Sequence, residues 1–328
     1  MSKVLITGGA GFIGFHLANY LSDNKNCEIS IIDNFTRNKK DKNFNDLIGR
    51  DNVKFINADM TTKDFYSSLS DYYDEIYHLA AINGTKYFYE KPYEVLRVNI
   101  LSLINIIEWI NESNCGKFIF SSSSEAYAGT INKFSDFENY FPTKEDISLS
   151  IDDVFNSRFS YGGSKITGEL ITINYFKKIN VSYSIIRYHN IYGPRMGYEH
   201  VIPEFLMKCY KKEVPFTIFG GQETRAFCYV MDAVKASELV MKNNYCDGQI
   251  IHIGNSNEEI KIIELAKKII DHLNLNLNIK VKNAPQGSVM RRCPDTSKLY
   301  KLTGFMAETP LDEGIELSNN WYRKNIKS

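Results

Sequence analysis

The sequence TGGAGFIG at residues 7–14 decides the fold of this chain. It follows the apolar run Val4-Leu5-Ile6 and leads into residues 12–21, where apolar side chains have helical spacing. Glycines between a strand and a helix let the backbone approach a pyrophosphate, whose charge the helix N-terminus stabilises. The spacing here is Gly8-x-x-Gly11-x-x-Gly14 rather than the commoner G-x-G-x-x-G. A glycine-rich turn without function is the alternative, but strand, turn and helix fall in register, which favours binding.

Short β-branched runs alternate with longer helical stretches after this turn, which predicts βαβ units around a parallel sheet. Further strands are expected at 29–32, 53–58, 75–79, 118–121 and 183–187, and helices near 63–70, 95–110 and 164–178. The polar stretch 34–50 predicts a surface loop or a short helix, and 122–159 is expected to be irregular. From about residue 193 the pattern loosens into short strands at 216–219, 227–229 and 250–253, with helices near 231–242 and 260–273.

This pattern predicts an α/β fold, a Rossmann-type doubly wound parallel sheet with a smaller C-terminal α/β lobe for substrate. Residues 1–190 would form the dinucleotide-binding domain, and residues 191–328 would form mainly the substrate lobe, interleaved with the first part. We expect no independent linked domain, because no low-complexity linker and no internal repeat of fixed period interrupts the chain.

An acidic residue ends the second expected strand, at Asp33. In dinucleotide-binding folds a carboxylate at this place accepts the hydroxyls of the adenosine ribose, and it would repel a 2′-phosphate. NAD is therefore expected rather than NADP. Arg37 argues the other way, because a nearby arginine could accept the phosphate.

Composition excludes several classes of function. The 328 residues contain 39 Lys and Arg and 39 Asp and Glu, so no overall basic field draws the chain to nucleic acid or to a membrane surface. No apolar run approaches the length needed to cross a bilayer, and the first strand leaves no room for a leader peptide. The six cysteines are scattered without zinc spacing, which predicts no metal site and reduced thiols in the cytoplasm.

A second motif, Tyr161-Gly162-Gly163-Ser164-Lys165, stands at the start of an expected helix. Residues four apart share one helix face, so the Lys165 ammonium can lie near the Tyr161 phenol. A neighbouring positive charge favours the phenolate, which would suit Tyr161 to act as a general base. Taken alone the pair is a weak signal, because the chain has 21 tyrosines, and an exposed helix pair without function is then the better interpretation.

Together the two motifs are more specific, and the sequence resembles the extended short-chain dehydrogenase/reductase family, whose members modify nucleotide-activated sugars. The resemblance covers essentially the whole chain. Besides the glycine turn and Tyr161/Lys165, it includes Asp33-Asn34, Asp59-Met60, His78-Leu79-Ala80-Ala81, residues 121–127, RYHNIYGPR at 187–195, Thr224-Arg225-Ala226-Phe227, and Arg291-Arg292-Cys293-Pro294-Asp295 leading to Gly304-Phe305.

The resemblance implies roles for individual residues. Tyr161 would take the proton of the sugar O4 while Ser123 hydrogen-bonds O4, and Lys165 would anchor the nicotinamide ribose. NAD would further contact Gly8, Gly11, Phe12, Ile13, Gly14, Asp33, Asn34, Asp59, Met60, Leu79, Ala80, Ala81 and Tyr161. The nucleotide-sugar substrate would contact Ser124, Asn190, Arg225 and Arg292. The resemblance also implies a homodimer, formed through helices that match 95–109 and 164–178.

Several of these residues have an alternative interpretation. Asn190 could only shape a turn, and His189 is better interpreted as a hydrogen-bonded core histidine. The choice between Arg291 and Arg292 stays open. Residues 83–89 are a candidate lid, because substrate choice is usually made on loops.

The enzymes that this chain resembles oxidise C4 of the sugar first and differ in the next step. The run GPRMG at 193–197, followed by HVIP at 200–203, resembles enzymes acting on GDP- or UDP-linked hexoses or heptoses for surface polysaccharide, such as a GDP-heptose 4-dehydrogenase or epimerase of capsule biosynthesis. We therefore expect a 4-dehydrogenase or a 4-epimerase. Ser124 argues against dehydratases with an Asp-Glu pair, but Glu125 could be a catalytic base at C5 in a 4,6-dehydratase or a UDP-glucuronate-type decarboxylase. A non-catalytic NAD sensor or scaffold is the second alternative, and it predicts the loss of Tyr161 or Lys165.

Overall fold

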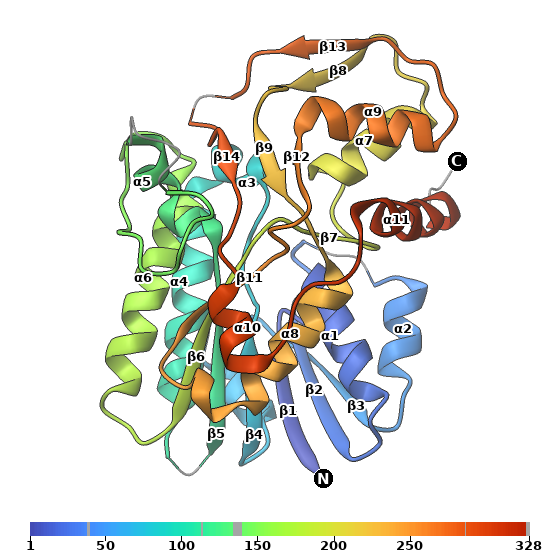
Figure 1. The fold of residues 1–328 in the computed structure, drawn as a ribbon. Helices are drawn as coiled ribbons and strands as arrows, with labels where there is room; N and C mark the ends of the chain where they lie inside the picture. The colour runs from blue at the N-terminus through green and yellow to red at the C-terminus, as the bar shows by residue number, and fades with distance from the viewer. Residues whose placement is uncertain (38–39, 113, 134–139, 286, 326–328) are drawn as a thin grey trace.

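A parallel sheet of seven strands forms the centre of the computed structural model, which describes residues 1–37, 40–112, 114–133, 140–285 and 287–325. Its strands are β1 (Ser2–Thr7), β2 (Cys27–Asp33), β3 (Val53–Asn57), β4 (Tyr73–His78), β5 (Cys115–Ser123), β6 (Ser182–Tyr188) and β11 (Ile250–Ile253). They are ordered β11-β6-β5-β4-β1-β2-β3 (Figure 1). Strands β2 and β3 are added on one side of β1, and β4 and the later strands are added on the other, so the order of the sheet reverses between β1 and β4. The predicted Rossmann-type doubly wound sheet is confirmed.

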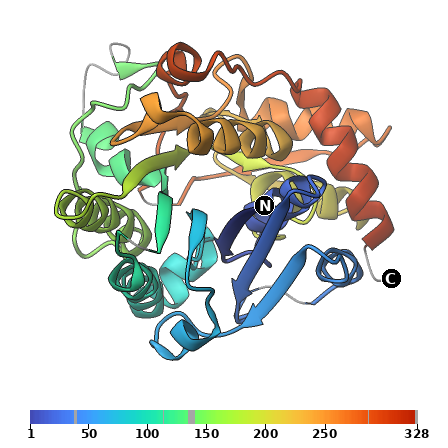
Figure 2. The same cartoon turned by 90° about the horizontal axis from the view of Figure 1, so that it is seen from below.

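Helices cover both faces of this sheet. On one face α1 (Phe12–Ser22) packs beside α8 (Val230–Lys242), and α4 (Pro92–Trp109) lies beside α6 (Phe159–Phe176) on the other. Figure 2 shows the sheet between these two layers. Because both faces are covered, Val4, Leu5 and Ile6 of β1 are all fully buried, which explains their continuous apolar run.

Smaller elements complete the N-terminal half and the C-terminal lobe. The N-terminal half adds α2 (Lys42–Ile48), α3 (Thr85–Glu90), α5 (Ala128–Lys133) and the 3-10 helices η1 (Asp64–Ser68) and η2 (Ser124–Tyr127). η4 (Asn244–Cys246) and α10 (Ser297–Thr303) pack beside α8 and β11. The C-terminal lobe contains β7 (Ile191–Tyr192), α7 (Val201–Tyr210), β8 (Phe216–Phe219), β9 (Thr224–Ala226), β10 (Cys228–Tyr229), β12 (Glu259–Lys261), α9 (Ile262–His272), β13 (Ile279–Lys282), β14 (Arg291–Arg292) and α11 (Leu311–Asn325). Small sheets β12-β9-β14, β13-β8 and β10-β7 hold it together.

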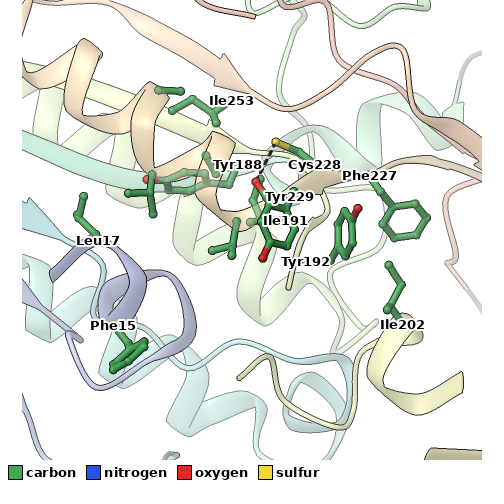
Figure 3. Packing of buried hydrophobic residues seen from close by; sticks show 14 of the residues in the cluster. Phe15, Leu17, Tyr188, Ile191, Tyr192, Ile202, Phe227, Cys228, Tyr229 and Ile253 are labelled. Atoms are coloured by element: carbon green, nitrogen blue, oxygen red, sulfur yellow. Dashed lines mark hydrogen bonds between the residues drawn. The ribbon is translucent and has the colours of Figure 1, made fainter. Parts of the chain in front are cut away.

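The lobe and the sheet share one hydrophobic core. Leu17 of α1, Tyr188 of β6, Ile202 of α7 and Phe227 belong to the same buried cluster (Figure 3). A second cluster fills the opposite face, between the sheet and the layer of α4 and α6. The chain also returns to the sheet after residue 191, where β11 pairs with β6.

Some expected boundaries were wrong. The helix expected to begin at residue 164 begins at Phe159, which places Tyr161 inside its first turn. Residues 63–70 form only the short 3-10 helix η1. The stretch 34–50 contains the short helix α2, which was one of the two expectations for it, and its Phe44 and Leu47 are buried. Within the described part of the chain, no helix combines the length and the apolar character that a membrane crossing requires.

Candidate active site

A cavity of about 1180 Å³ opens at the carboxyl ends of the parallel strands, where the order of the sheet reverses. Ligands bind at this place in open α/β sheets. A single small-molecule site usually measures about 300–1,000 Å³, so this cavity has room for a cofactor and a substrate together. Every residue that the sequence assigned to catalysis, NAD or substrate lines it, including Asn34, Asp59, Ala81 and Ser124.

The glycine turn forms one wall of the cavity and leaves no space for side chains. Gly8 has a φ of +68°, and a Cβ atom there would lie 2.7 Å from the Cα of Ala80. A Cβ atom on Gly14 would lie 2.4 Å from the carbonyl oxygen of Gly8. Helix α1 begins directly after Gly11 without a side-chain cap, so its first N–H groups are available to an anion. This cradle fits the pyrophosphate of NAD.

Asp33 ends β2 at the cavity wall. Its two carboxylate oxygens accept hydrogen bonds from the backbone N–H groups of Ala10 (3.1 Å) and Phe35 (2.8 Å), which fix its orientation. Burial raises the pKa of Asp33, while these hydrogen bonds oppose the rise. Arg37, the residue that argued for NADP, forms an ion pair with Glu199 at 3.0 Å and lies over the ring of Tyr87. The arginine already has an anionic partner, which agrees with NAD.

Helix α6 and strand β5 bring the predicted catalytic residues together. Tyr161 is buried in the first turn of α6, where it hydrogen-bonds the Ser123 hydroxyl and stacks on Phe88 with ring centroids 4.8 Å apart. One turn further on, Lys165 Nζ donates to the carbonyl oxygen of Ser121 at 2.7 Å. The hydroxyl of Tyr161 and the ammonium of Lys165 therefore reach the cavity from one helix.

The protonation of this pair differs from the expectation. Burial raises the pKa of Tyr161, because a buried phenolate loses its hydration, although the hydrogen bond with Ser123 opposes the rise. Burial likewise lowers the pKa of Lys165 to about 7, and Glu169 acts in the opposite direction. The expected phenolate is thus not favoured by the protein alone. A positive charge supplied by bound nicotinamide would act in its favour.

Glu125 is held between two arginines, of which sequence reasoning predicted only one. Its Oε1 atom lies 2.8 Å from Nη2 of Arg158 and 2.7 Å from Nη2 of Arg292. Burial opposes ionisation, but the two guanidinium groups outweigh it and lower the pKa of Glu125 to about 2. The side chain is therefore an ionised and weakly basic carboxylate. Arg158 precedes Tyr161 by three residues, and no sequence motif marked it.

The two consecutive arginines of β14 point to different partners. Arg291 points to Glu259, with its Nε and Nη2 atoms 2.8 and 2.9 Å from the two carboxylate oxygens. Arg292 lines the cavity, and its buried Nε has no hydrogen-bond partner among the described residues. A donor of this kind is suited to a phosphate or ribose oxygen.

Arg225 adds a further positive charge on the same side of the cavity. Its Nη1 donates to the Thr224 carbonyl at 2.7 Å. Burial and the charges of Arg292 and Arg158 lower the pKa of Arg225 to about 9. Positive charges at close range stabilise an anion between them, which is the property that a nucleotide diphosphate site needs.

The two alternative interpretations near β6 have different outcomes. Asn190 lines the cavity but also has a φ of +41° and donates to the Ala226 carbonyl at 3.1 Å, so it shapes the turn in any case. His189 is fully buried, and its Nε2 lies 2.8 Å from the hydroxyl of Tyr127, as expected for a core histidine.

Among the described residues, no group of three or more His, Cys, Asp and Glu side chains is placed to hold a metal ion.

Comparisons with known proteins agree with this geometry. The family model for the NAD dependent epimerase/dehydratase family matches residues 4–254. The chain is 32% identical to UDP-N-acetyl-alpha-D-glucosaminuronate decarboxylase of Bacillus cytotoxicus, over 98% of both chains. It is 29% identical to UDP-glucuronic acid decarboxylase 3 of Arabidopsis thaliana, over 99% of this chain and 90% of the relative.

Two solved structures of similar fold are 4-epimerases of nucleotide sugars. UDP-glucose 4-epimerase of Thermotoga maritima with UDP-glucose has a TM-score of 0.85 at 26% identity, and 99% and 100% of the two chains are covered. UDP-glucuronic acid 4-epimerase of Bacillus cereus, in complex with UDP-glucuronic acid and NAD, has a TM-score of 0.84 at 25% identity with the same coverage. The match of the family model, the glycine cradle and the Tyr161/Lys165 pair lead to one conclusion: this chain is an NAD-dependent enzyme of the epimerase/dehydratase family, within the short-chain dehydrogenase/reductases.

Proposed function

We propose that the chain oxidises C4 of a nucleotide-activated sugar. The observation that carries this proposal is the hydrogen-bonded pair Ser123 and Tyr161, with Lys165 one turn away, at the end of the dinucleotide cavity. NAD, held by the glycine turn and Asp33, would supply the acceptor for the hydride of C4. The O4 proton passes to Tyr161 while Ser123 holds O4, so that a 4-keto sugar results. Lys165 anchors the nicotinamide ribose.

We propose a 4-epimerase or a 4-dehydrogenase as the outcome that follows C4 oxidation. Abstracting the C5 proton requires a base, and a carboxylate with a pKa of about 2 and two arginine partners is a poor one. This disfavours a 4,6-dehydratase that uses Glu125. The structural similarity to 4-epimerases supports an epimerase in particular. The sensor alternative is disfavoured, because Tyr161, Lys165 and Ser123 are all present and placed together.

A decarboxylase is the second candidate, supported by the 32% identity to a decarboxylase of a nucleotide-linked uronic acid. Loss of a carboxylate from a 4-keto uronic acid needs no base at C5, so the ion pairs of Glu125 do not argue against it. For the sugar we retain a GDP- or UDP-linked hexose or heptose of surface polysaccharide, capsule included. We further propose that the enzyme works in the cytoplasm, in agreement with six free and buried cysteines.

The proposed enzyme is a homodimer. Helices α4 and α6 lie side by side and expose Tyr93 (70%), Leu96 (38%) and Leu170 (57%). Apolar side chains at this exposure on two adjacent helices suit an interface with a second copy of the chain.

The test identifies the dinucleotide bound to the protein and measures whether conversion of the sugar leaves net NADH. The purified protein is heated to release bound dinucleotide, which mass spectrometry identifies, and fresh protein is then mixed with GDP- and UDP-sugars while absorbance near 340 nm is followed. An altered sugar without net NADH supports an epimerase, or a decarboxylase if carbon dioxide is released. Net NADH supports a 4-dehydrogenase. A protein that neither contains nor binds dinucleotide would refute the proposal.

A further inference from the structure

We infer that Glu169 is a positioning residue for the proposed reaction: it fixes the strand end that carries Ser123, and it is the carboxylate that Lys165 faces. The inference rests on the proposed function, because it concerns the residues that would hold NAD and take the O4 proton.

Glu169 belongs to the face of α6 that carries the catalytic pair. It follows Lys165 by one helical turn and Tyr161 by two, and it is only 2% exposed. Its Oε1 atom accepts a hydrogen bond from the Ser122 hydroxyl at 2.5 Å. A buried carboxylate with charge-assisted hydrogen bonds holds its partners in one geometry.

A buried arginine completes this contact. Nε and Nη2 of Arg187 each lie 2.8 Å from one carboxylate oxygen of Glu169, in a bidentate pair. Arg187 stands on β6 directly opposite Ser122 on β5. Glu169 therefore joins the catalytic helix to two neighbouring strands at the point where both strands reach the cavity.

The residues on either side of Ser122 are the ones that the reaction uses. The Ser121 carbonyl accepts the hydrogen bond from Lys165, and Ser123 hydrogen-bonds Tyr161. Ser122 and Ser123 are consecutive in β5, so holding the Ser122 side chain on Glu169 restrains the backbone that carries the Ser123 hydroxyl. The cavity itself is not touched by Glu169, which acts through these residues.

Charge gives Glu169 a second effect on Lys165. Burial lowers the pKa of Lys165 to about 7, and Glu169 is the group that raises it. Tyr161 faces the ammonium from the same helix, and His78 faces it from β4, with a pKa that burial and Lys165 lower to about 3. His78 is therefore neutral near pH 7.

The remaining ionisable groups surround Arg187 rather than Lys165. The ring of Tyr127 lies beneath the guanidinium, and the Glu145 carbonyl accepts a hydrogen bond from Nη1 at 2.9 Å. Burial raises the pKa of Tyr127 and of Glu145, whereas burial and then Arg187 lower the pKa of His252 to about 3. Lys165 is thus the group whose charge changes close to pH 7.

The experiment measures NADH affinity against pH by fluorescence, on protein freed of dinucleotide, from pH 6 to 9. In the wild type the affinity falls as pH rises through the pKa of Lys165. In Glu169→Gln we expect this fall about one pH unit lower, so that NADH binds on the order of tenfold more weakly at pH 7.5. Glu169→Asp keeps the charge and should keep the midpoint. Glu108→Gln, on the exposed side of α4, is the control and should match the wild type.

A merely structural Glu169 would weaken NADH equally at every pH, and that result would overturn the inference. If Glu169→Gln does not fold, as judged by circular dichroism, the charge-balanced variant Glu169→Gln/Arg187→Gln replaces it and should show the same shift. Lys165→Met should lose the pH dependence, and its persistence would also overturn the inference. Failure of the wild type to bind NADH at any pH would instead refute the proposed function.

Discussion

Removing the charge of Glu125 should cost about 3 kcal/mol of folding free energy. In Glu125→Gln the buried guanidinium groups of Arg158 and Arg292 lose their shared carboxylate. The pKa of Glu125 falls from 4.5 to about 2 on folding, and each pH unit corresponds to about 1.4 kcal/mol, which gives this figure. It agrees with the 3–5 kcal/mol or so that removing one partner of a buried pair usually costs.

The pH dependence has a definite sign. Because the folded pKa of Glu125 lies below its unfolded value, the stabilisation is complete above about pH 4.5 and is lost as pH falls toward 2. Urea unfolding should therefore show a constant difference between wild type and Glu125→Gln from pH 5 to 8. The difference should shrink below pH 4.5. Thermal unfolding near pH 7 should give a midpoint about 5 °C lower, from the usual entropy of unfolding per residue.

The control is Glu259→Gln, which breaks the ion pair between Glu259 on β12 and Arg291, the neighbour of Arg292 on β14. The two side chains are 19% and 35% exposed, so water screens the pair and the loss should stay below about 1 kcal/mol. The reasoning is refuted if Glu125→Gln lies within about 1 kcal/mol of the wild type at pH 7. It is refuted equally if the control loses as much.

Three further predictions concern cofactor, catalysis and assembly. Tyr161→Phe should lower turnover by about 10²–10⁴-fold while NAD stays bound, and undiminished turnover would exclude Tyr161 as the base. Gly14→Ala should abolish NAD binding measured by calorimetry, because its Cβ would meet the Gly8 carbonyl at 2.4 Å, whereas Gly163→Ala, with its nearest contact at 3.4 Å, should bind normally. Light scattering should find a dimer that Leu170→Glu converts to monomer, and a monomeric wild type at micromolar concentration would contradict the proposed interface.

Local sequence predicted the elements whose signals lie within a few residues. The glycine turn, Asp33 and the Tyr161/Lys165 pair could each be read from a short motif. That these motifs serve one NAD site was implied by the family resemblance, and in the structure they line one cavity. The start of α6 was missed, because residues 159–163 contain two glycines and no apolar periodicity.

The contacts that set the charges of the site could not be predicted in this way. Glu125 and Arg158 are 33 residues apart, Glu169 and Arg187 are 18 apart, and Arg291 and Arg292 are neighbours that point to different partners. The sequence by itself determined a doubly wound sheet with a dinucleotide turn and a Tyr161/Lys165 pair on one helix. Tertiary packing, in contrast, makes Glu125 an ionised, weakly basic carboxylate between two arginines and brings Arg187 to Glu169. The reason is physical: motifs act through backbone geometry a few residues long, whereas a side chain's charge depends on its burial and on partners that distant strands bring within 3 Å.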